Sequence, residues 1–519
     1  MDPPAKMRSL GNLLVKLLLF GVLLLVVRFV YVVTIHGEHC DAGDFCFFST
    51  PEGIAALPGA GVAAGGGKVF VRRGEGATNP AWSSREWRRA VGYYSAVFQD
   101  LVAGGYISAE SKALCVDAGA GQEVVALKEI GVPGAVGVSK KKSAPLVVAG
   151  GDLSRLPFGN KTFDFVFSGH QTIERSKRPG NLASEIARTL KPEGFLVVHT
   201  LSAGDLYSRN SFLSLFPGFR LVNTRDIDGS DSSVTRQLVL QKGQGSHILL
   251  RGKKQSFEKS GSSGGRSTNK CTIPDHKRKL LQSAEPLINE EPLKPWITLK
   301  RNLKNIKYLS STVDINFKSR YVYVDVGARS YGSSIGSWFR KQYPKQNKTF
   351  DVYAIEADRT FHAEYARKKG VLLLPYAAWV RNETLSFEIN EDPDKKVQVK
   401  GRGMGRIQPA GSAGGLSEAK DVDKIQGFDF ADWLKSTVSA TDFVVIKMDV
   451  EGTEFDLIPR LFETGAICLI DELFLECHYN RWQRCCPGKR SPKYQNTYGQ
   501  CLELFTSLRE SGVLVHQWW

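Results

Sequence analysis

The chain has 519 residues, of which 42% are hydrophobic and 24% are charged. This composition is typical of a globular protein and excludes a wholly disordered, collagen-like or coiled-coil chain. At about 100–200 residues per domain, the length predicts two to four domains. Nine cysteines are too few for a disulfide-dense scaffold.

Most of the net charge of +16 lies in one stretch, 251–320, which holds 16 Lys and Arg against 6 Asp and Glu. This pattern favours a solvated basic linker. Binding to an acidic polysaccharide or lipid surface is the alternative. No aromatic-basic recognition motif accompanies the charge, so no nucleic-acid partner is expected.

The N-terminal region is predicted to be a membrane anchor. Leu13 to Val33 form an almost continuous apolar run, long enough to cross a bilayer core of about 30 Å as a helix. No small-x-small cleavage site follows, so an uncleaved signal anchor over 10–34 is favoured over a cleaved signal peptide. A Gly-, Ala- and Pro-rich stem over 35–82 is expected to be flexible.

Flanking charge predicts the orientation of the anchor. Lys6 and Arg8 precede the anchor and Lys16 lies near its N-terminal end, whereas acidic residues dominate immediately after it. The positive-inside rule therefore predicts a single-pass type II protein of the Golgi or endoplasmic reticulum membrane, with its domains in the lumen. Three Asn-x-Thr sequons agree with a lumenal glycoprotein: they begin at Asn160, Asn347 and Asn382.

Cysteine positions are compatible with an oxidising lumen. Cys115 and Cys468 lie in apolar runs and are predicted to be buried core residues. A cluster near the C-terminus comprises Cys477, Cys485, Cys486 and Cys501. A zinc site made from this cluster and His478 is one interpretation. The spacing matches no zinc-ligand pattern, so disulfides are favoured and no metal is expected.

The region 83–241 is predicted to form a first α/β domain. A helix from Ser83 or Ser84 to about Val102 has apolar residues at helical spacing. The predicted strands that follow are 113–116, 134–138, 145–148, 163–167 and 195–199, with helices at 124–130 and 182–190. Alternation of strands and helices predicts a parallel, doubly wound sheet.

A glycine-rich loop follows the first of these strands. In Val-Asp117-Ala-Gly119-Ala-Gly121, the two glycines allow a nucleotide-like ligand to approach the backbone closely, and the following helix adds favourable dipoles. Val124 stands where a dinucleotide fingerprint has a third glycine, which argues against NAD. Further along the chain, Gly-Asp152-Leu-Ser-Arg-Leu-Pro-Phe precedes the Phe-Asp-Phe-Val-Phe strand.

This order of motifs resembles the type-11 branch of class I S-adenosylmethionine (SAM) methyltransferases over about 87–241. The resemblance implies that the loop with Asp117, Gly119 and Gly121 holds the methionine end of SAM, and that Asp152 contacts the adenine. The family usually has an acidic residue at the end of the second strand, where this chain has Ser139. A neutral hydroxyl binds ribose more weakly than a carboxylate. The first domain is therefore either a weak SAM site or a degenerate domain kept for packing.

After a basic linker predicted for 242–319, a second strand–helix series begins in the domain 320–519. Its predicted strands are 321–326, 352–355, 371–375, 443–448 and 473–476, with helices at 334–342 and 430–435. Asp325 and Gly327 close its first strand, Gly332 follows in the loop, and Glu356 ends the second strand. Glu356 is thus where a ribose-binding carboxylate is expected.

Two later segments carry further polar residues. One reads Lys447-Met-Asp449-Val-Glu451-Gly-Thr-Glu454, and the other ends a strand with Glu476-Cys-His478. Together with the preceding loop they resemble the FkbM-type methyltransferases over about 321–478. The resemblance implies that SAM is bound by Asp325, Gly327, Gly332 and Glu356. The substrate side of the cleft would hold Lys447, Asp449, Glu451, Glu454, Glu476 and His478. The alternative for the acidic run is a solvated turn at a helix N-terminus.

The predicted fold class is α/β, with two Rossmann-like methyltransferase domains behind a transmembrane helix. This layout also resembles a plant membrane-anchored family of methyltransferase-like proteins. The expected function is SAM-dependent O-methylation of an unknown glycan or small-molecule hydroxyl. The alternative is a membrane-anchored, non-catalytic scaffold.

The second domain is the favoured site of methyl transfer. Asp449 is the first choice for orienting the acceptor, and His478 or Glu476 for taking its proton, because a general base near neutral pH needs a tuned pKa. Lys447 either lowers the pKa of the acceptor hydroxyl or pairs with Glu451 or Glu454.

Overall fold

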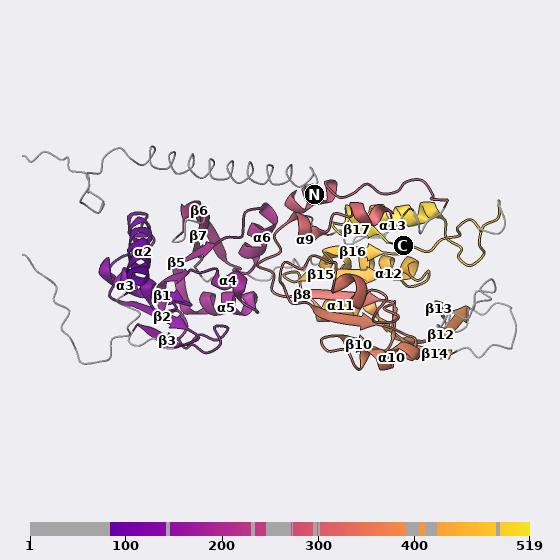
Figure 1. The fold of residues 1–519 in the computed structure, drawn as a ribbon, viewed down its shortest axis with the longest axis horizontal. Coiled ribbons are helices and arrows are strands. Elements are labelled where there is room, and N and C mark those ends of the chain that lie inside the picture. The colour runs from indigo at the N-terminus through magenta and orange to yellow at the C-terminus, as the bar shows by residue number, and fades with distance from the viewer. Residues whose placement is uncertain are drawn as a thin grey trace, which may run out of the picture. The chain divides into compact units, whose positions relative to one another are not determined.

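The computed structural model describes residues 84–141, 146–229, 234–244, 271, 273, 275–293, 298, 301–390, 404–409, 423–483 and 488–518 (Figure 1). The predicted anchor (10–34) and stem (35–82) lie outside these residues. Among the helices that are described, none has both the length and the apolar character needed to span a membrane. We call the described residues of 84–244 the first module and those of 271–518 the second module.

The first module is built on a seven-stranded sheet in the order β3-β2-β1-β4-β5-β7-β6. Its strands are β1 (Ala113–Val116), β2 (Ala135–Ser139), β3 (Val147–Ala149), β4 (Phe163–Ser168), β5 (Leu190–Thr200), β6 (Phe219–Asp228) and β7 (Val234–Lys242). The strands β1 to β5 pair in parallel, as predicted, whereas β7 is antiparallel to both β5 and β6. The β6–β7 hairpin was not predicted from the sequence.

Helices cover both faces of this sheet, as the predicted doubly wound fold requires. They are α2 (Arg85–Ala103), α3 (Gln122–Glu129), α4 (Thr172–Arg175), α5 (Pro179–Thr189) and α6 (Leu206–Ser214). Ser84 is the cap of α2, because its side chain accepts a hydrogen bond from the Trp87 amide. Alternate residues of β1 enter different cores: Leu114 packs in the core that contains α5 residues, and Cys115 in the core that contains α2 and α3 residues. Cys115 is buried, as predicted, and it forms no disulfide.

The main sheet of the second module has six strands in the order β10-β9-β8-β15-β16-β17. They are β8 (Tyr321–Val326), β9 (Asp351–Ile355), β10 (Leu372–Leu374), β15 (Phe443–Met448), β16 (Glu472–Leu475) and β17 (Leu514–Gln517). All neighbours pair in parallel. This strand order is the one typical of dinucleotide-binding sheets. The C-terminal region, for which no strand was predicted, supplies strand β17.

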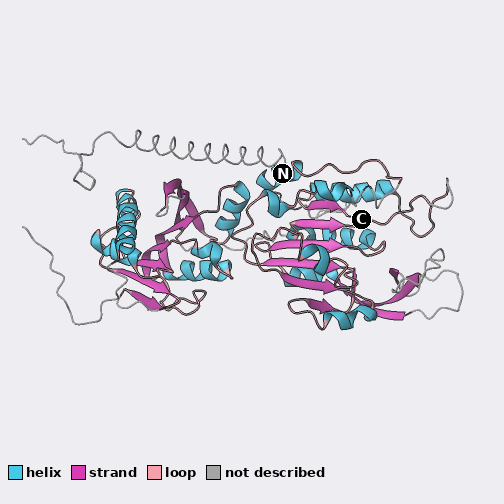
Figure 2. Ribbon diagram, viewed as in Figure 1, coloured by secondary structure: helices cyan, strands magenta, loops and turns pink. Residues whose placement is uncertain are grey.

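Two buried cores enclose this second sheet, so strands and helices form layers (Figure 2). Val324 packs with residues of α11, α12 and α13, whereas Tyr323 packs on the other face with Trp338 and Phe339. The helices are α7 (Asp275–Gln282), η2 (Leu303–Asn305), α9 (Leu309–Thr312), η3 (Ile335–Phe339), α10 (Arg359–Tyr365), α11 (Phe430–Thr437), α12 (Glu454–Thr464), η4 (Ala466–Leu469) and α13 (Tyr498–Glu510). The helix predicted for 334–342 is only a short π-helical turn, η3.

A separate four-stranded sheet was not predicted. Its order is β11-β14-β12-β13, with β11 (Ala377–Trp379), β12 (Glu383–Asn390), β13 (Met404–Pro409) and β14 (Asp423–Asp429). Its own small core contains Trp379, Leu385 and Ile425. Because Phe387 of β12 and Ile407 of β13 line the cavity described below, this sheet forms part of the candidate site.

Part of the predicted linker, 242–319, belongs to the second module. A disulfide joins Cys271 to Cys468, and Cys468 is exposed, so the prediction that it is a buried core residue was wrong. Leu309 and Ile315 are buried in the core of the second module. The domain thus includes residues well before the predicted boundary at 320. A second disulfide, Cys477–Cys501, agrees with the prediction that the C-terminal cysteines form disulfides, whereas Cys485 and Cys486 lie outside the described residues.

Candidate active site

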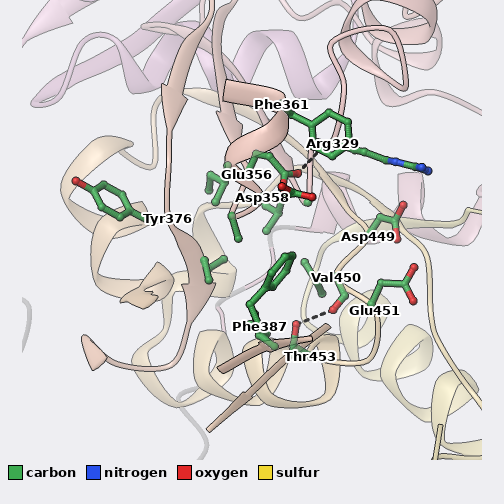
Figure 3. A pocket seen from close by; sticks show the side chains of 17 residues that line it. Arg329, Glu356, Asp358, Phe361, Tyr376, Phe387, Asp449, Val450, Glu451 and Thr453 are labelled. Carbon is green, nitrogen blue, oxygen red and sulfur yellow. Dashed lines mark hydrogen bonds between the residues drawn. The ribbon is translucent and has the colours of Figure 1, made fainter. Parts of the chain in front are cut away.

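A cleft opens at the carboxyl edge of the second module's parallel sheet, where ligands of open α/β folds bind. The cavity measures about 110 Å³ and is lined by residues that follow β8, β9 and β15 and by residues of the separate sheet (Figure 3). Glu356 and Asp358 lie on one side, and Asp449 and Glu451 on another. Three of these four acidic residues had predicted roles: Glu356 as a cofactor residue, and Asp449 and Glu451 as residues of the substrate side.

Glu356 directly follows β9 and is 8% exposed. Its two carboxylate oxygens accept hydrogen bonds from the backbone amides of Arg329 (2.5 Å) and Asp358 (2.6 Å). Burial raises the pKa of this carboxyl, although the two amide bonds oppose the shift. A carboxylate has about four acceptor sites, so capacity remains for ribose hydroxyls. The placement fits the predicted ribose-binding role.

Gly327 brings the loop after β8 against the end of β15. Its φ of +77° is a conformation that favours glycine, and an added Cβ would lie 1.9 Å from the Asp449 carbonyl oxygen. No side chain fits there. Gly327 was predicted to be a residue of the cofactor loop. The structure shows that this glycine also allows the loops after β8 and β15 to come into contact.

The other two predicted cofactor residues of this loop do not line the cavity. Asp325 is fully buried, accepts a hydrogen bond from the Ser334 hydroxyl, and lies 3.6 Å from the Lys447 ammonium nitrogen. An added Cβ at Gly332 would meet no atom within 4 Å. Asp325 therefore acts on the site indirectly, through its ion pair with Lys447. The packing around position 332 does not require glycine.

Lys447 is buried between two carboxylates. In the β8–β15 register Lys447 stands opposite Asp325, and its Nζ lies 3.5 Å from Asp449 Oδ2. Burial disfavours the ammonium charge, but the carboxylates of Asp325, Asp449 and Glu476 outweigh it and raise the pKa of Lys447. The pairing with Glu451 or Glu454 considered from the sequence is thus replaced by pairing with Asp325 and Asp449.

The acidic residues after β15 are held in defined positions. Glu451 is 7% exposed, and its Oε2 accepts hydrogen bonds from the Tyr494 hydroxyl and from Lys493 Nζ, the latter at 2.9 Å. Burial opposes ionisation, but His478, Tyr494 and Lys493 lower the pKa of Glu451. A solvated turn, the alternative considered for this run, does not describe such buried and partnered carboxylates. Lys493 and Tyr494 lie in the C-terminal region and were not predicted as site residues.

His478 lies behind the cavity-lining carboxylates and is 1% exposed. Its Nδ1 is 3.2 Å from Glu454 Oε1, which also accepts from the His478 backbone amide at 2.6 Å. Burial works against protonation, but Glu454, Glu451 and Asp449 raise the pKa of His478 to about 9. Glu476 lies nearby, with its Oε1 3.8 Å from His478 Nε2. Burial and Asp449 raise the pKa of Glu476 to about 7.

The corresponding loop of the first module is arranged differently. Gly119 and Gly121 both have positive φ, and Gly121 is the residue before α3. Ser139 Oγ donates to Asp117 Oδ1 at 3.4 Å, so the residue that replaces the usual carboxylate is itself tied to the loop. Asp152 is exposed and accepts from the amide and hydroxyl of Ser154, which lower its pKa.

Two first-module residues near this loop were not predicted. His170, just after β4, has its Nε2 2.7 Å from Oε1 of Glu123, a buried residue in the first turn of α3. The Tyr94 hydroxyl lies 3.2 Å from the same nitrogen. Hydrogen bonding to Glu123 raises the pKa of His170, against the effect of burial. A histidine just after a central strand was the available sequence signal.

Two family models match the chain. A model described as a methyltransferase domain matches residues 116–198, which include the loop and β1 to β5 of the first module. The first module is therefore similar to a methyltransferase domain over these residues. A model described as a domain of unknown function (DUF7870) matches residues 281–386 and 414–519 of the second module. No curated protein matches the chain.

Solved methyltransferase structures resemble about a third of the chain. A SAM-dependent methyltransferase of Thermotoga maritima is 18% identical, with 30% of this chain and 91% of that chain covered and a TM-score of 0.23. One from Aquifex aeolicus is 15% identical, with coverage of 30% and 92% and a TM-score of 0.24. The 1,6-didemethyltoxoflavin-N1-methyltransferase of Burkholderia thailandensis, with bound S-adenosylhomocysteine, is 15% identical, with coverage of 30% and 79% and a TM-score of 0.24.

Two observations indicate the activity of the protein: the methyltransferase family model and the strand order of the first sheet. The protein is accordingly a methyltransferase, and its cofactor is SAM. The model that matches the second module carries no stated function. The resemblance of that module to FkbM-type enzymes therefore remains a prediction.

Proposed function

We propose that the protein is an O-methyltransferase of the secretory pathway, and that transfer takes place in the second module. The observation that carries the proposal is the cleft itself, which places Glu356 after β9 and Asp449 after β15 around one cavity. A cofactor carboxylate and an acceptor-facing carboxylate are thus combined at the edge of the sheet where ligands bind. The acceptor is a hydroxyl group of a glycan or a small molecule.

The cofactor side of the cleft offers both polar and apolar groups. Glu356 would accept hydrogen bonds from the ribose hydroxyls, while Ile355 and Phe361 line the same cavity and offer apolar contacts to the adenine. The loop at Gly327 leads from this side toward Asp449. SAM supplies an activated methyl group, and its thioether leaves without charge. The protein therefore has to align the two reactants and accept the hydroxyl proton.

The acceptor side is organised around Asp449. Its side chain is 22% exposed and lines the cavity, while Lys447 holds Oδ2. Asp449 would accept the hydrogen bond of the acceptor hydroxyl, orient its oxygen toward the methyl group, and take the hydroxyl proton as the O–CH₃ bond forms and the S–CH₃ bond of SAM breaks. His478 lies 3.7 Å from Asp449 and Glu476 lies beside His478, but neither is among the residues that line the cavity.

Several features support a lumenal location. The asparagines of all three sequons, Asn160, Asn347 and Asn382, are exposed. Two disulfides, Cys271–Cys468 and Cys477–Cys501, connect parts of the second module, and disulfides persist mainly in oxidising compartments. Together with the predicted anchor at 10–34, these features favour the Golgi or endoplasmic reticulum membrane with both modules in the lumen.

Transfer in the first module is a second candidate, because the methyltransferase-domain model matches there. The His170–Glu123 pair at the carboxyl edge of β4 would supply a proton acceptor beside the glycine loop. This candidate lacks a carboxylate at the end of β2, where Ser139 stands.

Photocrosslinking of labelled SAM to the full-length protein tests which module binds the cofactor. We expect labelled peptides from 352–361 and 449–453, and loss of this label in Glu356→Gln. Label confined to 116–152 would overturn the assignment to the second module.

Methyl transfer itself is measured with tritium-labelled SAM and glycan and small-molecule fractions of secretory membranes. Asp449→Asn should lower the rate by about 100-fold or more at saturating SAM, whereas His170→Gln should leave it unchanged. The reverse pattern would favour the first module. Absence of both cofactor label and transfer would favour a non-catalytic scaffold.

A further inference from the structure

Three side chains beside the cleft converge on one point. Asp449, Glu451 and His478 each present one oxygen or nitrogen atom, and these atoms all lie within 4.8 Å of one another. They come from the ends of β15 and β16, which are adjacent parallel strands. The carboxyl ends of neighbouring parallel strands meet at one edge of the sheet, so residues far apart in the sequence are brought together here.

The imidazole of His478 is oriented with its Nε2 toward this point. Nδ1 faces Glu454 Oε1 at 3.2 Å, and Glu454 is itself fixed because its two oxygens accept from the backbone amides of His478 and Gly452. A carboxylate can only accept, so Nδ1 carries the hydrogen and donates it. When a bound cation displaces the second ring proton, the lone pair that it meets is the one on Nε2. Histidines that bind a metal through one ring nitrogen commonly donate the other ring N–H to a carboxylate, as His478 does to Glu454.

Nε2 is buried and has no hydrogen-bond partner. The nearest carboxylate oxygens belong to Asp449 (3.7 Å), Glu476 (3.8 Å) and Glu451 (3.9 Å). These distances are too long for hydrogen bonds. Buried polar atoms are rarely left unsatisfied in native proteins. An unpartnered nitrogen that faces three carboxylate oxygens therefore indicates that a cation binds between them.

The carboxylates are also held so that one oxygen of each faces Nε2. Asp449 turns Oδ1 to the histidine, while Oδ2 faces Lys447 at 3.5 Å. Glu451 turns Oε1 to the histidine, while Oε2 is held by Lys493 and Tyr494. The groups that would have to be positioned for metal binding are thus already constrained by a second layer of contacts.

We propose that Asp449, Glu451 and His478, with Glu476 as an additional oxygen ligand, bind a divalent metal ion of the Mn²⁺ or Zn²⁺ class. The single imidazole nitrogen favours a transition metal over Ca²⁺ or Mg²⁺, which prefer all-oxygen sites. Metal–ligand bonds of about 2.0–2.2 Å place neighbouring ligand atoms about 3.0–3.4 Å apart. Small side-chain movements from the distances given above would close the site.

The ion would lie at the edge of the cavity, because Asp449 and Glu451 line it. If methyl transfer occurs in this cleft, as proposed above, a metal with an open position would bind the acceptor oxygen and ease loss of its proton. An acceptor with two neighbouring oxygens, such as a vicinal diol or a hydroxy acid, would be favoured because it can chelate the ion. This role in acceptor binding rests on the proposed function, whereas metal binding does not.

Mn²⁺ titration of the EDTA-stripped, full-length protein tests the site without SAM or an acceptor. Electron paramagnetic resonance of free Mn²⁺ should show one strongly bound ion per chain, and Zn²⁺ should compete with it. His478→Gln and Asp449→Asn should each weaken binding by about 100-fold or more, and Glu454→Gln by about 10- to 100-fold through the orientation of His478.

His516→Gln is the matched control. His516 is also buried, but both of its ring nitrogens are already partnered, by Glu285 at 2.6 Å and Glu472 at 2.9 Å. Its substitution should leave Mn²⁺ binding unchanged. Circular dichroism identifies variants that fail to fold, and the partly exposed Asp449→Asn decides the outcome if His478→Gln does not fold. Absence of a bound ion, or equal binding by wild type and Asp449→Asn, would overturn the proposal.

The two proposals can fail separately. A bound ion without SAM crosslinking to the second module would contradict only the proposed function. Methyl transfer that continues at full rate in the stripped protein would contradict the role of the ion in acceptor binding, and the Mn²⁺ titration would still decide whether the site exists.

Discussion

The two modules of this chain have similar sheets but differ in their edge strands and in the residue that ends the second strand. Both begin with the strand order 3-2-1-4-5, but the first sheet continues with β7, which is antiparallel to both of its neighbours, and ends with β6, whereas the second remains parallel through β17. At the end of the second strand of each series the first module has Ser139, tied to Asp117, and the second has Glu356, which faces a cavity.

Two modules with similar strand order can therefore differ in the residues that form their binding sites. The second module adds a four-stranded sheet, and its Phe387 and Ile407 line the cavity. It also adds a buried set of charges around Lys447 and His478. The first module has the family-model match, but its loop has a neutral residue at the ribose position.

The largest contrast is expected between two loop glycines. Gly327→Ala would place a Cβ 1.9 Å from the Asp449 carbonyl oxygen in a positive-φ conformation. We expect a loss of about 4 kcal/mol or more in the free energy of unfolding of the second module. Gly119→Ala meets no atom within 4 Å, so only the strain of positive φ remains, about 1–2 kcal/mol. Urea unfolding measures both, and equal losses would contradict the packing argument.

Reducing agents should affect the modules unequally. The Cys271–Cys468 disulfide closes a loop with a sequence separation of 197, whereas the cysteine described in the first module, Cys115, is free. Reduction should destabilise the second module by about 3–5 kcal/mol, because it restores conformational freedom to the unfolded chain. Hydrogen exchange with and without reductant should show the change in 271–518. Comparable changes in 84–244 would show that the disulfide stabilises both modules.

Two buried histidines should give opposite pH dependences. Burial opposes protonation of His516, but Glu285 and Glu472 raise its pKa to about 9. Because the unfolded value is lower, this stabilisation is complete below about pH 6.5 and disappears as the pH rises through 9. Burial lowers the pKa of His199 to about 4. Its contribution is therefore present above about pH 6.5 and disappears as the pH falls toward 4.

Urea unfolding of the full-length protein at several pH values checks these slopes. Each histidine should contribute about 2–3 kcal/mol across its window. His516→Gln should flatten the alkaline decline, and His199→Gln should flatten the acidic one. A decline that persists unchanged in the matching variant would show that another group titrates.

The smallest expected contrast concerns the ribose position. Glu356→Gln should weaken SAM binding by the second module by about one to two decades, since one charged hydrogen bond is worth about 1.5–3 kcal/mol. Ser139→Asp should strengthen binding by the first module by no more than this, because Asp117 lies close enough to repel the new charge. Calorimetry on the full-length protein measures both changes. An unaffected affinity in Glu356→Gln would show that this carboxylate does not contact the cofactor.

Local sequence patterns were sufficient for the repeating strands and the loops at their ends. The apolar runs at 113–116, 321–326 and 443–448 are short, buried and followed by glycine or acidic residues, so both their conformation and their position at the sheet edge could be predicted. Glu356 and Asp449 were identified because each directly follows such a strand. The buried state of Cys115 followed from its apolar neighbours for the same reason.

Contacts between distant segments could not be predicted in this way. Lys447 pairs with Asp325 because β8 and β15 are neighbours in a particular register, whereas the sequence pointed only to nearby Glu451 and Glu454. Cys468 has its partner 197 residues away. The four-stranded sheet and the contact of Glu454 with His478 likewise depend on pairing between remote segments.

The sequence alone thus determined the two α/β series, their glycine loops and the acidic residues that follow the strands, because these depend on side-chain periodicity and on conformations available to single residues. Tertiary structure decided which of those residues share a cavity and which are buried as supports. It also brought His478 next to Asp449 and Glu451, because strand order and register, which arise from packing of the whole domain, place the ends of β15 and β16 side by side.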